Sequence, residues 1–154
     1  MHSLAAERRS NQRLCEYLRG GARPEFPAVA RPDEFVRPYE QLGTHPDLVV
    51  RLWDELTVLL PGDCRFVLFG RPVLLHPESE VAFGLALGTQ AYALRLPEVV
   101  LAEAIAAGAS RVHRYPGRSP FDLDVIGPEW MFCNWHRDED RWCLAAYELA
   151  GTAD

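Results

Sequence analysis

Lysine is absent from the chain, and each of its 16 basic residues is an arginine. Chemistry that depends on a lysine side chain, such as a Schiff base or the phosphate-binding lysine of a P-loop, is therefore excluded. Three short motifs are also missing: CxxC of thioredoxin-like and zinc sites, GxSxG of α/β-hydrolases, and HExxH of zinc proteases. Any functional site must therefore be argued from single residues and their spacing.

Long apolar runs are missing as well. The first residues, MHSLAAERRSNQ, do not supply the apolar core of a signal peptide, and no segment approaches the length of a membrane span. We therefore expect a cytoplasmic protein without membrane association. Its four cysteines are then expected to be free thiols: Cys15, Cys64, Cys133 and Cys143.

The chain is acidic, and its charged residues are unevenly distributed along the sequence. The 154 residues carry 22 acidic side chains against the 16 arginines, a net charge of -6, which makes nucleic-acid binding an unexpected function. Residues 1–37 hold seven arginines against five acidic residues, a net +2, so the other 117 residues carry -8. A hydrophobic content of 48% at this length fits a single globular core.

Proline and glycine divide the chain into two parts. Residues 3–19 predict a helix that ends at a pair of glycines, and the four prolines of residues 22–43 predict an extended strap over the body or a mobile arm. We therefore expect residues 1–43 to form an N-terminal helix plus a strap or arm. Residues 44–154 are expected to form a single α+β domain.

Periodicity within residues 44–154 predicts three further helices and six strands. The fold class is α+β, with a mostly antiparallel sheet of about six strands, helices packed on one face, and the order α-α-ββββ-α-β-β-α. The expected helices are 44–60, 97–107 and 138–150, and the expected strands are 64–69, 72–76, 81–87, 91–96, 111–115 and 130–135.

Short motifs in the middle of the chain give a family resemblance. They are Phe69-Gly70, Phe83-Gly84-Leu85, Tyr92-Ala93-Leu94-Arg95 and Ala107-Gly108. In this order, residues 47–150 resemble the N-terminal domain of TfoX-type competence regulators and the related YjbR-like domains. The resemblance implies a non-enzymatic regulatory or binding domain.

Alternation in the third and fourth strands predicts a sheet with one bulky face and one face of small residues. The small residues are Ala82, Gly84, Ala86, Ala91 and Ala93, with Arg95 among them. If exposed, this face would form a flat floor on which Arg95 binds an anion or a carboxylate. Arg71, His76 and Arg114 are candidates for its rim. Alternatively, the small face is solvated or covered by the strap.

The segment from Trp130 to Cys143, WMFCNWHRDEDRWC, allows two interpretations. As a metal site it would use His113, Cys133, His136 and Cys143 as ligands. As a corner of the core it would place Met131, Cys133 and Trp135 on one strand face, beneath the apolar stripe of the last helix. We favour the core interpretation, because a free cysteine usually behaves as a small buried apolar residue.

A hydrolase site is a further alternative, built from His113, Asp122, Asp124 and His136. No catalytic motif accompanies these residues, and aspartate is common in turn-rich segments. We therefore expect a small binding or regulatory domain that acts through protein–protein contact, without cofactor or turnover. The partner is unidentified, and a homodimer is one such arrangement. An immunity or antitoxin-type protein is the narrower alternative, and a metal-dependent hydrolase is the third.

Overall fold

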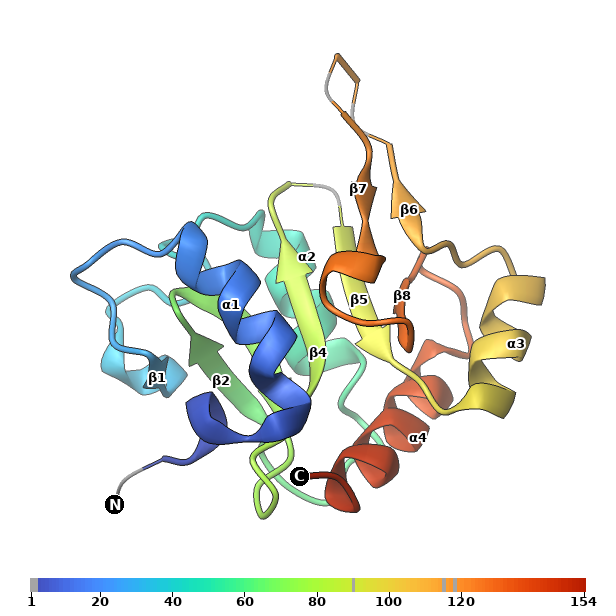
Figure 1. Ribbon diagram of the computed structural model, residues 1–154, viewed down its shortest axis with the longest axis horizontal. Helices are drawn as coiled ribbons and strands as arrows, with labels where there is room; N and C mark the ends of the chain where they lie inside the picture. The colour runs from blue at the N-terminus through green and yellow to red at the C-terminus, as the bar shows by residue number, and fades with distance from the viewer. Residues whose placement is uncertain (1–2, 90, 115, 118) are drawn as a thin grey trace.

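A computed structural model describes residues 3–89, 91–114, 116–117 and 119–154 of the protein. In this part of the chain, six strands form one sheet in the order β1-β2-β3-β4-β5-β8, and all neighbours are antiparallel (Figure 1). The predicted α+β class and antiparallel sheet are therefore confirmed. The strands are β1 (Val29–Ala30), β2 (Arg65–Leu68), β3 (Arg71–Leu75), β4 (Ala82–Leu87), β5 (Ala91–Arg95) and β8 (Trp130–Phe132).

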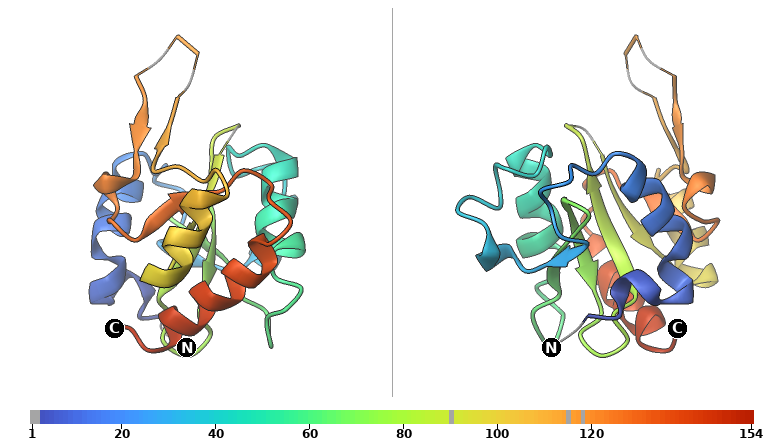
Figure 2. Two further views of the ribbon diagram at one scale, coloured as in Figure 1. Left: turned by 90° about the vertical axis from the view of Figure 1, so that its right-hand side faces the viewer. Right: turned by 60° about the vertical axis from the view of Figure 1, so that its left-hand side comes forward.

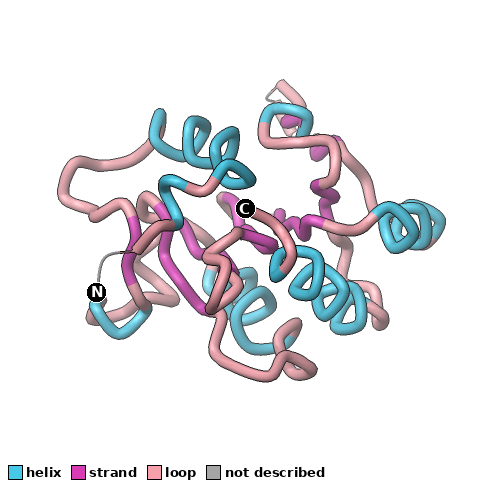
Figure 3. The backbone as a smooth tube through the Cα atoms, turned by 60° about the horizontal axis from the view of Figure 1, so that its bottom comes forward, coloured by secondary structure: helices cyan, strands magenta, loops and turns pink. Residues whose placement is uncertain are grey.

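Helices cover both faces of the sheet, whereas the sequence predicted helices on one face only. The helices are α1 (Gln12–Gly20), α2 (Pro46–Val50), which continues into a π-helical turn at Arg51–Glu55, α3 (Glu98–Ala106) and α4 (Glu139–Gly151). Helix α1 packs on one face, and α2 and α4 pack on the other (Figures 2 and 3). Strand β4 is buried along its whole length, so both of its faces need an apolar cover.

A β-bulge explains why the predicted bulky face does not exist as one surface. Leu75 pairs with Ala82 and Leu74 pairs with Gly84, so Phe83 is an extra residue in β4. Val81 and Phe83 consequently belong to the core under α2 and α4, whereas Leu85 and Leu87 belong to the core under α1. The period-2 pattern alone cannot reveal a bulge, because one inserted residue reverses the facing of every residue after it.

The N-terminal third of the chain is part of the body. Two short 3-10 turns, Ala5–Glu7 and Arg9–Asn11, precede α1, so the helix predicted from residue 3 begins only at Gln12. Buried Asn11 connects this segment to the sheet, since its Oδ1 accepts a hydrogen bond from the Ala82 amide at 2.8 Å. The proline-rich strap contributes β1, which pairs along β2 at the sheet edge.

A two-stranded hairpin replaces the predicted fifth strand of the main sheet. Among the described strands, β6 (Val112–His113) pairs with β7 (Phe121–Asp122) and with no strand of the main sheet, and the two strands project from the body in Figures 1 and 2. Of the predicted strand 111–115, Tyr115 lies outside the described residues. Among the helices that the structure describes, none combines the length and apolar character needed to cross a membrane.

Candidate binding groove

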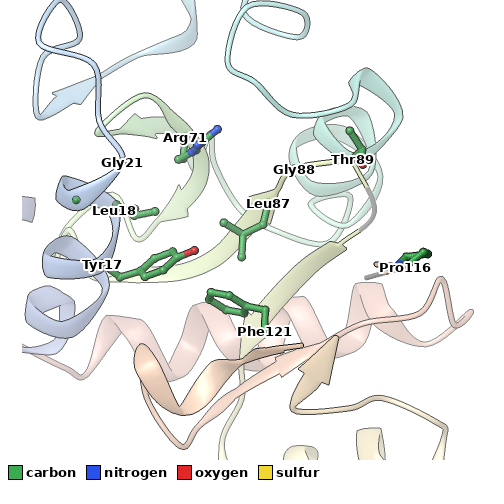
Figure 4. A pocket seen from close by; sticks show the side chains of 10 residues that line it. Tyr17, Leu18, Gly21, Arg71, Leu87, Gly88, Thr89, Pro116 and Phe121 are labelled. Carbon is green, nitrogen blue, oxygen red and sulfur yellow. The ribbon is translucent and has the colours of Figure 1, made fainter. Parts of the chain in front are cut away.

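A groove opens at the end of the sheet where β3 begins and β4 ends. It has a volume of about 790 Å³ and is open to solvent on one side, a size within the range of ligand sites. Four segments supply its walls: the last turn of α1, the start of β3, the β4–β5 turn and the β6–β7 hairpin. The lining residues are Tyr17, Leu18, Gly20, Gly21, Arg71, Leu87, Gly88, Thr89, Pro116 and Phe121 (Figure 4).

Three apolar side chains form the centre of the groove. The rings of Tyr17 and Phe121 meet edge to face with their centroids 5.1 Å apart, which joins α1 to the hairpin. Leu87, at the end of β4, lies between Arg71 and Phe121 in Figure 4. Tyr17 remains 37% exposed, so part of this apolar wall is open to a ligand.

Arg71 is the cation of the groove, and its position is fixed by the backbone beside it. Its Nη1 donates a hydrogen bond to the Leu42 carbonyl at 3.2 Å. Gly43 makes room for this contact, because a Cβ at that position would lie 2.8 Å from Nη1 and the glycine has a φ of +68°. Burial raises the pKa of Tyr17, and the charge of Arg71 partly offsets this rise.

Within the described part of the chain, Arg71 has no carboxylate partner. The hydrogen bond to Leu42 is its one polar contact there. Two other half-buried arginines differ in this respect: Arg51 pairs with Glu139 at 2.9 Å and Arg95 pairs with Glu129 at 3.0 Å. The groove therefore holds a positive charge that the described residues leave without a counterion.

A second hollow adjoins the groove and shares Gly21 and Arg71 with it. Its volume is about 550 Å³, and the rings of Phe26 and Phe69 supply its apolar surface. Its two other charged side chains already have partners, since Arg23 pairs with Glu25 at 3.6 Å and Glu40 pairs with Arg37 at 3.7 Å. Arg71 thus lies between the groove and a second, mainly polar hollow that also contains the rings of Phe26 and Phe69.

The other predicted rim residues do not join Arg71. His76 lies at the opposite end of β3, roughly 17 Å away at the usual rise per residue of a strand, and is buried against Tyr147 with the ring centroids 4.5 Å apart. Arg95 ends β5 in its ion pair with Glu129. Arg114 is exposed beside the hairpin.

The exposed floor expected around Arg95 is not present. All five small residues of the predicted face are buried in the sheet: Ala82, Gly84, Ala86, Ala91 and Ala93. Helix α1 covers part of this face, and Ala82, Ala91 and Ala93 pack in the same core as Leu14 and Leu18. The bulge at Phe83 turns Ala86 to the opposite core.

The residues of the alternative metal site do not form a metal-binding cluster in the described part of the chain. Over the described residues, no three His, Cys, Asp or Glu side chains are arranged to hold a metal ion. Cys143 is buried within α4, and the His136 ring stacks on Trp142 at 5.2 Å. His113 packs against Phe132 at 5.6 Å, and Cys133 follows the end of β8.

The thiols are poorly suited to nucleophilic chemistry. Burial raises the pKa of Cys64 to about 11, with a smaller contribution from the negative charge of Asp63. Burial likewise raises the pKa values of the Cys15, Cys133 and Cys143 thiols. Because the thiolate is the reactive form, these side chains remain protonated and unreactive near neutral pH.

A buried carboxylate, which was not predicted from the sequence, lies at the start of α4. Glu139 has no exposed surface, and its two oxygens accept hydrogen bonds from four donors. These donors are Arg51 Nη2 at 2.9 Å, the Tyr92 hydroxyl, and the backbone amides of Asn134 and His136, each at 2.9 Å. With its oxygens occupied in this way, the carboxylate serves as a structural anchor rather than as a catalytic base.

The same network presents Trp135 on the surface, which corrects the prediction that this residue lies in the core. Trp135 is 51% exposed and has a φ of +65°. Its amide donates to the Tyr92 hydroxyl at 2.8 Å, and the Arg51 guanidinium lies over its ring at 5.2 Å. Strand β8 ends at Phe132, so the alternation predicted through residue 135 stops three residues earlier.

Two groove residues, Tyr17 and Phe121, were also not predicted from the sequence, because they lie 104 positions apart and neither belongs to a motif.

Comparison of the chain with protein-family models, with curated proteins and with solved structures finds no match.

Proposed function

We propose that this protein is a non-enzymatic binding or regulatory domain that acts through contact with a protein partner, and that the partner docks in the groove around Arg71. One observation carries the proposal. A half-buried guanidinium lies beside an apolar wall, and the described residues provide no carboxylate for it. A charge in such a position is stabilised when a ligand supplies the opposite charge.

The state of the reactive side chains supports binding rather than turnover. The four thiols have raised pKa values, and the Glu139 carboxylate is saturated by hydrogen bonds. Burial, followed by the nearby Glu139 carboxylate, also raises the pKa of Tyr92, which keeps its hydroxyl protonated. The resemblance of residues 47–150 to TfoX and YjbR-like domains has the same implication, and a cytoplasmic location is part of the same proposal.

Site-specific photo-cross-linking in cells tests this function. p-Benzoylphenylalanine in place of Tyr17 puts the photoreactive group on the wall of the groove. The same substitution at Val99, which is 82% exposed on α3, is the matched control. We expect a discrete protein adduct from position 17 and none from position 99.

A blocking substitution shows whether an adduct depends on the groove. Gly21 has a φ of -109° and open space where a Cβ would lie, so Gly21→Leu fills the groove without backbone strain. The position-17 adduct should disappear in this variant. Equal adducts from positions 17 and 99, an adduct that survives Gly21→Leu, or no adduct at all would contradict the proposal.

A further inference from the structure

We infer that the groove binds an extended acidic segment of the partner, in which apolar residues stand two positions before and two positions after one Asp or Glu. The carboxylate pairs with Arg71, and the two flanking side chains occupy the groove and the adjoining hollow. This inference rests on the proposed function, because it names the chemistry of the partner at the same site.

The charge of the site selects a carboxylate. Arg71 presents a planar guanidinium, which matches the geometry of a carboxylate, and one of its nitrogens is already anchored to the Leu42 carbonyl. The site also adjoins residues 1–37, the net-basic segment of an acidic protein. The guanidinium groups of Arg19 and Arg23 lie over the rings of Phe69 and Phe26 beside the second hollow. An acidic segment is therefore the complementary partner.

Apolar surface lies on both sides of this charge. Tyr17, Leu87 and Phe121 line the groove, and Phe26 and Phe69 line the adjoining hollow. In an extended chain, successive side chains point to opposite faces, so side chains that point the same way are two residues and about 6.6 Å apart along the chain. Such residues can reach adjacent hollows. The partner segment therefore carries an apolar residue two positions before and two positions after its acidic residue, in the order of these surfaces around Arg71.

The continuity of the two hollows favours an internal segment over a chain end. A terminal carboxylate would end at Arg71 and leave the second hollow empty. Glycines at the rim also leave space for a passing main chain: a Cβ at Gly20, Gly21 or Gly88 would meet no atom within 4 Å. The partner's backbone can therefore cross this part of the rim without displacing a side chain.

Synthetic peptides with blocked ends provide a direct test. The probe is acetyl-Gly-Phe-Ser-Glu-Ser-Phe-Gly-amide, and its controls replace the central Glu by Gln or both Phe by Gly. A fourth peptide ends at the Glu with a free carboxylate. Binding is followed by the amide NMR signals of Gly20, Gly21 and Gly88, which lie at the groove, with Gly62 and Gly151 as remote references.

We expect the Glu peptide to bind about tenfold more tightly than the Gln peptide, as a charge-assisted hydrogen-bonded pair implies. Arg71→Gln should reduce this ratio to near one, and Arg71→Lys should retain part of it. Arg137→Gln, at a remote exposed arginine, should leave the ratio unchanged. Thermal unfolding of each variant shows whether it folds. Gly21→Leu, which keeps Arg71, should weaken binding of every peptide.

Each result has a defined meaning. Equal affinity of the Glu and Gln peptides, no binding of any peptide, or tighter binding of the chain-end peptide would overturn the inference. If the cross-link at position 17 still depends on the groove in that case, the proposed protein-binding function stands without it. Failure of both the peptides and the cross-link removes the function as well.

Discussion

The Arg51 guanidinium and the Glu139 carboxylate form a buried ion pair, with Nη2 and Oε1 2.9 Å apart, between the π-helical turn after α2 and the first turn of α4. The pair also organises the loop between β8 and α4, since the other Glu139 oxygen accepts the amides of Asn134 and His136. A single carboxylate thus connects the π-helical turn, the start of α4 and the loop between β8 and α4.

Glu139→Ala is expected to lower the free energy of unfolding by about 3–5 kcal/mol, because it removes the buried charged partner of Arg51 and the acceptor of the Tyr92 hydroxyl and of two backbone amides. Glu55 is the matched control: it pairs with the same arginine at 3.2 Å but is exposed to solvent. Glu55→Ala should cost about 0.5 kcal/mol or less. Urea unfolding monitored by circular dichroism measures both values, and similar costs for the two variants would disprove the anchoring role of Glu139.

Trp135→Ala is expected to cost about 1 kcal/mol or less, because half of the side chain is already exposed. Trp142→Ala, at a tryptophan that is 1% exposed in α4, should cost about 3–5 kcal/mol. Trp135→Gly should be at least as stable as Trp135→Ala, since glycine adopts positive φ without strain. Equal losses at Trp135 and Trp142 in urea unfolding would restore the core interpretation of Trp135.

The sequence was sufficient for the parts of the fold that local periodicity determines. The strands at Arg65–Leu68 and Ala91–Arg95 lie within their predicted ranges, as does α3. The strand at Arg71–Leu75 begins one residue before its predicted range of 72–76. In contrast, the prediction of which β4 side chains share a face was wrong. The bulge at Phe83 arises from pairing with β3, and the local sequence pattern does not indicate it. Strand β1 was not predicted within the proline-rich strap, because its two residues form a strand only through pairing with β2.

The candidate site was also predictable only in part, because contacts between distant segments form it and local periodicity does not show them. Arg71 was predicted only as a rim residue of a binding floor around Arg95, and the structure does not contain that floor. Its actual surroundings come from Tyr17, Leu42 and Phe121, which tertiary packing brings together from distant segments. Glu139 lies in a run of three acidic residues, Asp138–Asp140, and the sequence alone cannot show which of their carboxylates is buried.

Stability is expected to fall as the pH rises from about 9 to about 11, in part because of Cys64. Burial raises the pKa of its thiol from 9.0 to about 11 in the folded protein. Below pH 9 both states hold the proton. Between the two pKa values, the unfolded chain releases the proton while the folded protein keeps it. The unfolded state then binds fewer protons, so the free energy of unfolding decreases, by up to about 1.4 kcal/mol per pH unit.

Cys64→Ala isolates this contribution from those of the other thiols and the tyrosines. The free energy of unfolding is measured in urea under reducing conditions at intervals from pH 7.5 to 10.5, for the wild type and the variant. The variant should lose less stability than the wild type over the alkaline part of this range, and the difference should vanish below about pH 8. Parallel profiles would show that the Cys64 thiol ionises alike in both states and that its burial does not oppose the thiolate.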